Sequence, residues 1–142
     1  MSERDVVVGV DGSAPSRAAL RWGLDQARLT GARLRAVIAW EVPAYTGWGS
    51  MAYEDFGAAA GKLLSEAVHD TIGLDPPLEV EVVETAMAGH PAQVLIDQSA
   101  HAGLLVVGSR GHGGFAGTLL GSVSQLCAQH AHCPVVVVRG KY

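Results

Sequence analysis

Short β-type runs alternate with helical stretches along the whole chain, and this alternation limits the possible folds more than any other feature. The first run, Val6–Val10, is almost entirely apolar, as expected for a strand that is buried on both faces. Similar runs are predicted at Leu34–Trp40, near Glu79–Ala86, at Leu104–Gly108 and at Pro134–Arg139. Strands that alternate with helices are joined by right-handed crossovers, which produce a mostly parallel sheet with helices on both faces. We therefore predict an α/β fold.

Four helices are predicted between these strands. Ser13 can cap the first helix, Pro15 suits its first turn, and Gly31 can end it. The other three helices are expected from about Glu54 to Ile72, from Gly89–His90–Pro91 to about Ala100, and from about Ser122 to Ala131. The stretch Pro43–Phe56 is predicted to be a long irregular loop, a kind of segment that is often functional.

The bulk composition indicates one globular domain over residues 1–142. The chain has 142 residues, close to the commonest domain size, and 49% of them are apolar. Its formal net charge is -4 and its basic residues are not clustered, which argues against a nucleic-acid partner. No apolar stretch approaches the ~20 residues of a membrane span, and the N-terminus does not resemble a signal peptide. Cys127 and Cys133 form no CxxC pair, so we expect reduced thiols and a cytoplasmic protein.

The most informative segment follows the fourth predicted strand and reads GSRGHGGFAGTLLGSVS. It holds six glycines from Gly108 to Gly121, followed by a helix start. Glycines allow positive φ and let a bulky anion approach the main-chain N–H groups, and a helix start adds unpaired donors. Ser122 and Ser124 can donate hydroxyl hydrogen bonds to phosphate oxygens, and Arg110 can add positive charge. A tight turn alone would not need six entropically costly glycines, so we predict a polyphosphate site.

Other nucleotide and catalytic motifs are absent. A P-loop would need a Lys directly after Gly121, where Ser122 stands. Gly111 to Ala116 mimic the GxGxxA of dinucleotide folds, but they follow the fourth strand, and no acidic residue lies downstream to hold a ribose. A GxSxG elbow is missing, which argues against a serine hydrolase. The third strand is followed by no acidic residue, so a phospho-accepting receiver domain is also excluded.

Two further groups of residues have competing interpretations. His130, His132 and Cys133, with Cys127 nearby, suggest zinc, but a closed ligand set is missing, and packing with helix-dipole contacts is favoured. Several aromatic residues could stack on a base or cover the site, although packing at a core edge is favoured. These aromatics are Trp40, Tyr45, Trp48 and Tyr53.

The glycine loop resembles the nucleotide motif of the universal stress protein family, in its ATP-binding branch. The pattern G-x2-G-x9-G-[ST] is met by Gly108, Gly111, Gly121 and Ser122. The start VVVGVDGS, the turn Gly89–His90–Pro91 and the ending CPVVVVR are also similar to the family, so the resemblance covers nearly the whole chain. It implies a Rossmann-like fold of the adenine nucleotide α-hydrolase-like type. The expected sheet is open, twisted and five-stranded, with strand order 3-2-1-4-5.

The resemblance also implies a ligand, ATP with or without Mg²⁺, and a set of binding residues. Asp11 would bond the ribose, and the backbone of Ala39 would recognise the adenine edge. Ribose and phosphates would be lined by Gly108, Arg110, Gly111, Gly121, Ser122, Val123 and Ser124. We therefore expect a nucleotide-dependent stress-response module rather than an enzyme. Because Asp11 is the only obvious acidic residue near the site, fast turnover is not expected, and a slow ATP hydrolase stays open as the alternative.

The last predicted strand suggests how two copies of the chain could associate. Members of the family that the chain resembles commonly dimerise through this strand. Here it is an apolar run that we predict to lie at the edge of the sheet, and an exposed apolar edge favours pairing with another chain. We therefore predict an antiparallel homodimer through Val135, Val136, Val137 and Val138.

Overall fold

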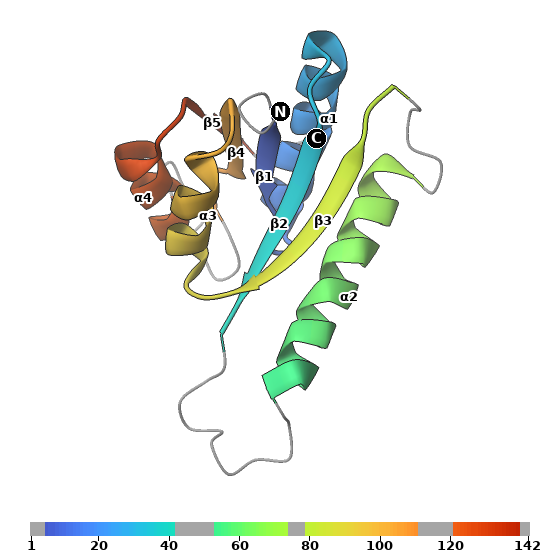
Figure 1. Cartoon of the computed structure of the whole chain (residues 1–142), viewed down its shortest axis with the longest axis vertical. Coiled ribbons are helices and arrows are strands. Elements are labelled where there is room, and N and C mark those ends of the chain that lie inside the picture. The colour runs from blue at the N-terminus through green and yellow to red at the C-terminus, as the bar shows by residue number, and fades with distance from the viewer. Residues whose placement is uncertain (1–4, 42–52, 74–78, 111–120, 140–142) are drawn as a thin grey trace.

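The computed structural model describes residues 5–41, 53–73, 79–110 and 121–139. Predicted features in 42–52, 74–78 and 111–120 lie outside these residues. In the described part of the chain, strands and helices alternate as predicted (Figure 1). In chain order they are β1 (Val6–Gly9), α1 (Ala14–Thr30), β2 (Leu34–Trp40), α2 (Tyr53–Ile72), β3 (Val82–Ala88), α3 (Pro91–Ser99), β4 (Leu104–Gly108), α4 (Ser122–His130) and β5 (Val135–Val138).

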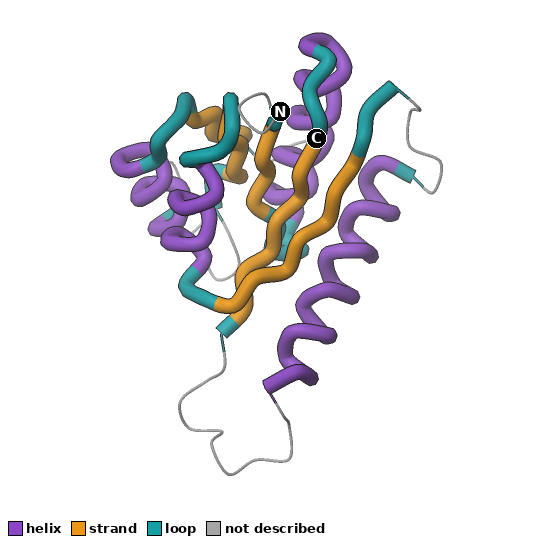
Figure 2. Tube along the Cα trace, viewed as in Figure 1, coloured by secondary structure: helices purple, strands orange, loops and turns teal. Residues whose placement is uncertain are grey.

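The five described strands form one parallel sheet in the order β3-β2-β1-β4-β5. This order confirms the predicted fold class, and it places β5 at one edge, as predicted. The tube view in Figure 2 shows the sheet between its helices. β1 lies at the centre, with Val6 opposite Leu34 of β2 and Leu104 of β4. Val7 and Val8 are fully buried, which explains why this strand is apolar on both faces.

Two helices cover each face of the sheet, as Figure 1 shows. α1 and α2 pack on one face, where Leu20, Leu34 and Leu64 belong to one buried cluster. α3 and α4 pack on the other face, where Leu95 and Cys127 belong to a second cluster. Buried apolar side chains on both faces stabilise the sheet by about 25 cal/mol for each Å² removed from water. None of the described helices is long and apolar enough to cross a bilayer.

Two predicted boundaries are wrong. β3 begins at Val82 rather than near Glu79, because its register starts opposite Leu34 of β2 and the preceding residues form a turn. The predicted irregular stretch Pro43–Phe56 overlaps the first residues of α2, which begins at Tyr53. Both errors concern where an element starts, not which elements exist.

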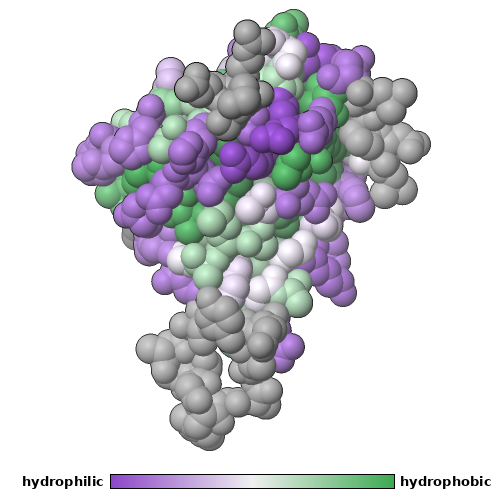
Figure 3. Space-filling model, in the orientation of Figure 1, coloured by the Kyte–Doolittle hydropathy of each residue, from purple (hydrophilic) through white to green (hydrophobic). Residues whose placement is uncertain are grey.

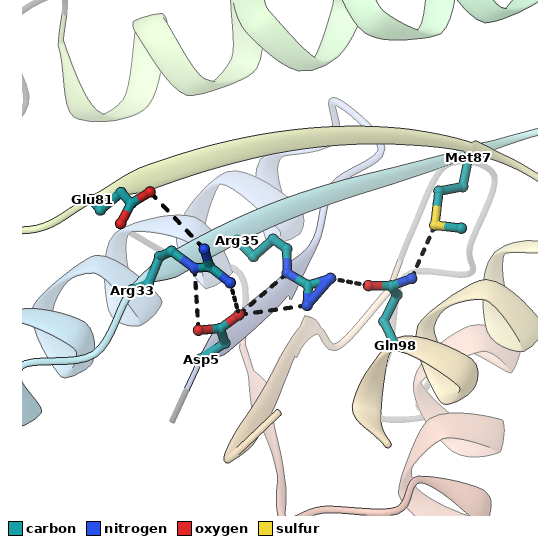
Figure 4. Close-up of polar contacts among 6 residues, drawn as sticks. All are labelled: Asp5, Arg33, Arg35, Glu81, Met87 and Gln98. Carbon is teal, nitrogen blue, oxygen red and sulfur yellow. Dashed lines mark hydrogen bonds and ion pairs between the residues drawn. The ribbon is translucent and has the colours of Figure 1, made fainter. Parts of the chain in front are cut away.

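A charged cluster joins β1, β2 and α3 at the amino-terminal end of the sheet (Figure 4). Asp5 is only 2% exposed, and its carboxylate lies 2.8 Å from a guanidinium nitrogen of Arg33 and 3.4 Å from Nε of Arg35. The hydrogen bond from Arg33 and the charge of Asp5 raise the pKa of that guanidinium. Arg35 also donates to Gln98 of α3. In Figure 3, strongly hydrophilic residues gather over the upper part of the sheet, the end opposite the carboxyl ends of the strands.

Candidate functional site

At the carboxyl ends of the neighbouring strands β1 and β4, the chain leaves the sheet in opposite directions. The two strands are neighbours, but β1 leads through α1 to β2 on one side, and β4 leads through α4 to β5 on the other. In open parallel sheets, ligands bind in the crevice beyond such a point. The two connections touch there, because a Cβ added to Gly108 would lie 2.7 Å from the carbonyl carbon of Pro15. Glycine at this position lets the start of α1 pack directly on the end of β4.

The turn after β1 is fixed by local hydrogen bonds. Asp11 is partly buried, and its Oδ1 accepts the N–H of Ser13 at 2.9 Å. Gly12 has φ of 83°, in the left-handed region that favours glycine. Ser13 then caps α1, because its side chain accepts the N–H of Ser16 at 3.3 Å. A carboxylate offers about four acceptor sites, so the side chain of Asp11 can accept hydroxyl groups as well as main-chain N–H groups.

The start of α4 differs from the start of α1 because its N-cap residue is a glycine, which has no side chain to cap the helix. Gly121 is in extended conformation, and among the described residues no side-chain cap bond is present. The amides of Ser122 and Val123 therefore begin the helix without a capping acceptor from residue 121. In α1, by contrast, Pro15 has no N–H and Ser13 accepts from the first turn. Amides that the N-cap residue does not cap, together with the positive end of the helix dipole, make the start of α4 suitable for an anion.

The glycine-rich loop is closed at its base by main-chain and side-chain bonds. The carbonyl of Ser109 accepts the N–H of Gly121 at 2.8 Å, and the N–H of Ser109 donates to Val138 at 2.9 Å. Ser124 is 2% exposed, and its hydroxyl donates to the carbonyls of Ser109 at 3.1 Å and of Gly121 at 2.9 Å. One hydroxyl proton is thus shared by two carbonyls. In this arrangement the Ser124 hydroxyl fastens the base of the loop, and its predicted bond to a phosphate stays a prediction.

Ala39 lies in β2, two residues past the last residue that pairs with β1. The ladder between β1 and β2 ends at the pair Gly9 and Val37, and Val10 donates its N–H to the carbonyl of Val37. Backbone groups of alternate residues in a strand face the same side, so the N–H and C=O of Ala39 face the β1 side, two residues past Val37. On its other side, β2 still pairs with β3 as far as Trp40. In the described residues, no strand pairs with the backbone of Ala39 on the β1 side.

The structure brings most of the predicted site residues to one end of the sheet. Asp11 and Gly108 follow or end the two neighbouring strands, and Gly121, Ser122 and Val123 open α4. Arg110 is partly buried at the start of the loop. Gly111 lies outside the described residues. The roles of these residues toward a nucleotide stay predictions.

Two residues of this site were missed by sequence reasoning. Ser16 is buried, accepts the N–H of Asp11 and donates to the carbonyl of Ser13. Ser109 supplies the carbonyl on which the loop closes. The signal for Ser16 was the spacing D-G-S-x-x-S, which places a second hydroxyl three residues after the N-cap. Ser109 acts through its main chain, so its residue type gave no signal.

The structure describes several of the histidine, cysteine and aromatic residues for which the sequence left competing interpretations. No group of three or more His, Cys, Asp or Glu residues that could hold a metal occurs in the described residues. Burial raises the pKa of the Cys127 thiol to about 11, so this thiol is protonated at neutral pH. Trp40 is partly buried against the core, and a Cβ on Gly57 would lie 3.1 Å from Cζ2 of its ring. Tyr45, Trp48 and the side chain of Tyr53 lie outside the described residues.

Comparison with known proteins identifies relatives of nearly the whole chain. The model of the universal stress protein family matches residues 3–139. Universal stress protein Rv2623 of Mycobacterium tuberculosis is 36% identical over 134 residues, which cover 94% of this chain and 44% of that protein. A universal stress protein of Mycolicibacterium smegmatis is 35% identical over 142 residues, 97% of this chain and 46% of that protein. The chain thus spans less than half the length of these curated relatives.

Solved structures of universal stress proteins share the fold. UspA from Lactobacillus plantarum superposes with a TM-score of 0.74 at 22% identity, covering 96% of this chain and 97% of its own. A universal stress protein in complex with cAMP gives 0.74 at 25% identity, covering 99% and 100%. One from Archaeoglobus fulgidus in complex with dAMP gives 0.60 at 22% identity, covering 97% and 99%. Together with the family match over almost every residue, these similarities show that the chain belongs to the universal stress protein family.

Proposed function

We propose that this protein binds an adenine nucleotide, in particular ATP, at the carboxyl ends of β1 and β4. The observation that carries the proposal is the start of α4, whose glycine N-cap offers no side-chain acceptor, beside the turn of Asp11 at the point where ligands bind in parallel sheets. Two structural relatives support the ligand class, because they were solved with cAMP and with dAMP. Both of those ligands combine an adenine with a phosphate.

Each part of the nucleotide has a group of matching chemistry. The N–H and C=O of Ala39 can pair with the donor and acceptor atoms on the adenine edge. The carboxylate of Asp11 can accept bonds from ribose hydroxyls. The amides of Ser122 and Val123, with the glycine loop, can hold phosphate oxygens. A micromolar site corresponds to about 8 kcal/mol of binding free energy, which several main-chain bonds and a buried base can supply.

We further propose that the nucleotide acts as a signal in a stress response and not as a rapidly consumed substrate. Rapid hydrolysis needs a group that positions water and usually acidic residues that help to hold Mg²⁺. In the two described turns, Asp11 is the one acidic residue. Slow hydrolysis is the second candidate, because Asp11 could still orient water. We also propose a cytoplasmic location, where the free thiols of Cys127 and Cys133 would stay reduced.

We propose that β5 pairs with β5 of a second chain to form an antiparallel homodimer. β5 is an edge strand, and its outer side has no strand partner among the described residues. Its four valines are mostly half-buried against the two core clusters, so pairing would cover an apolar edge.

The test of nucleotide binding is a calorimetric titration of ATP into wild type and Gly121→Val. Gly121 has φ of -68°, which valine adopts without strain, so the variant should fold. The added side chain would crowd the start of α4, and we expect ATP affinity to fall at least tenfold. Gly61→Val is the matched control, because a Cβ at Gly61 meets nothing within 4 Å. Unchanged affinity in Gly121→Val would contradict the proposed site.

A further inference from the structure

Two buried serines occupy equivalent places in the two turns of the candidate site. Ser16 and Ser124 each lie three residues after the N-cap of their helix. The hydroxyl of each donates to the N-cap carbonyl, at 3.0 Å to Ser13 and at 2.9 Å to Gly121. Each hydroxyl also reaches the end of the preceding strand segment. Ser16 accepts the N–H of Asp11 at 3.3 Å, and Ser124 donates to Ser109 at 3.1 Å.

Among the helices whose N-cap is described, this arrangement occurs in the two that flank the site. α1 and α4 follow β1 and β4, which are neighbours in the sheet. The third helix with a described N-cap is α3, and the equivalent residue there is Gln93, which is exposed and bonds Asp97 one turn further on. Ser16 is 4% exposed and Ser124 is 2% exposed. Buried hydroxyls that bond main-chain groups of a turn restrict the conformations open to that turn.

We propose that Ser16 and Ser124 are positioning residues, which hold the two turns in the geometry that receives the nucleotide. This inference rests on the proposed function. Ser16 acts through Asp11, because it holds the main-chain N–H of the residue whose carboxylate faces the ribose. Ser124 acts through the first amides of α4, because it fixes the N-cap carbonyl and the base of the loop. Neither hydroxyl needs to touch the ligand.

The two serines should affect different parts of the ligand. Asp11 binds the ribose, which adenosine, AMP and ATP all contain. The start of α4 binds phosphate, which adenosine lacks. Ser16→Ala should therefore weaken all three ligands by a similar factor, whereas Ser124→Ala should weaken AMP and ATP and leave adenosine unchanged. A role in overall stability alone would not separate the ligands in this way.

The experiment measures the affinity of adenosine, AMP and ATP for wild type, Ser16→Ala, Ser124→Ala and Ser99→Ala. Ser99 is the matched control because it is 1% exposed, donates to Ile96 and accepts the N–H of His132, far from the two turns. We expect losses of about tenfold in the pattern given above, which is the effect of one misplaced hydrogen-bonding group. Ser99→Ala should keep wild-type affinity for each ligand.

Amide hydrogen exchange in the ligand-free protein separates the inference from the proposed function. Exchange should quicken at Asp11 in Ser16→Ala and at Gly121 in Ser124→Ala, and at neither in Ser99→Ala. If exchange quickens in the two variants but wild type binds no nucleotide, the fastening of the turns stands, and both the proposed function and the positioning role are overturned. Binding by wild type with unchanged affinities in both variants, or equal losses in Ser99→Ala, would overturn the positioning role alone.

Discussion

Gly108 is the residue at which the two halves of the site come closest together. A Cβ at this position would lie 2.7 Å from the carbonyl carbon and 2.8 Å from the Cβ of Pro15. The backbone at Pro15 cannot move aside without displacing α1, so the contact has no soft neighbour that could give way. The glycine that sequence reasoning assigned to a phosphate cradle thus has a packing role as well.

Gly108→Ala should lower the free energy of unfolding by about 1–3 kcal/mol, because the added methyl group overpacks the contact with Pro15. Urea unfolding of the purified variant measures this change. Gly61→Ala is the control, since its Cβ meets nothing within 4 Å in the interior of α2. Alanine is favoured over glycine in a helix by up to about 1 kcal/mol, so the control should gain stability. Equal effects of the two substitutions would contradict the packing role.

At the scale of elements, the boundaries that local chemistry sets were predictable, and those that distant pairing sets were not. α1 is bounded by the predicted cap Ser13 and by Gly31, which has φ of 73°. The start of β3 is set by its pairing register with β2, and the residue types near Glu79 do not indicate that register. Likewise, the glycine motif revealed the candidate site, but the direction of the Ser124 hydroxyl depends on the carbonyl of Ser109, fifteen positions earlier in the chain.

Asp5 binds Arg33 and Arg35, and Arg35 in turn bonds Gln98 of α3, so removal of Asp5 should destabilise the contacts among β1, β2 and α3 together. Asp5→Asn would leave the guanidinium groups of Arg33 and Arg35 close together without their shared carboxylate. Breaking a fully buried ion pair costs about 3–5 kcal/mol, but Arg33 is 37% exposed, so we expect a smaller fall of about 2 kcal/mol in the free energy of unfolding. Asp25→Asn is the control, because its pair with Arg28 is exposed and contributes less than about 0.5 kcal/mol. A loss in Asp5→Asn no larger than the control's would refute the linking role.

At the scale of the whole molecule, the proposed dimer depends on the outer side of β5. The carbonyls of Pro134 and Val138 accept bonds from β4, so the backbone groups of Val135 and Val137 face outward. Proline at an outward position removes one N–H without breaking the ladder to β4. The outward edge can therefore be altered separately from the sheet.

Val137→Pro should convert the dimer to a monomer, whereas Val137→Ala, which also loses the valine side chain but keeps the N–H, should still pair. Light scattering at micromolar concentration measures the mass of each. We expect the mass of two chains for wild type and Val137→Ala, and of one chain for Val137→Pro. A monomeric wild type would contradict the proposed dimer.

The central claim is that main-chain amides at the start of α4 hold the phosphates of an adenine nucleotide beside Asp11. The most direct measurement is a crystal structure of the protein grown with excess ATP. The account predicts phosphate oxygens within hydrogen-bond distance of the amides of Ser122 and Val123, ribose hydroxyls on Asp11, and the adenine edge on the backbone of Ala39. A structure in which this crevice is empty or closed, or in which the nucleotide binds elsewhere, would contradict it.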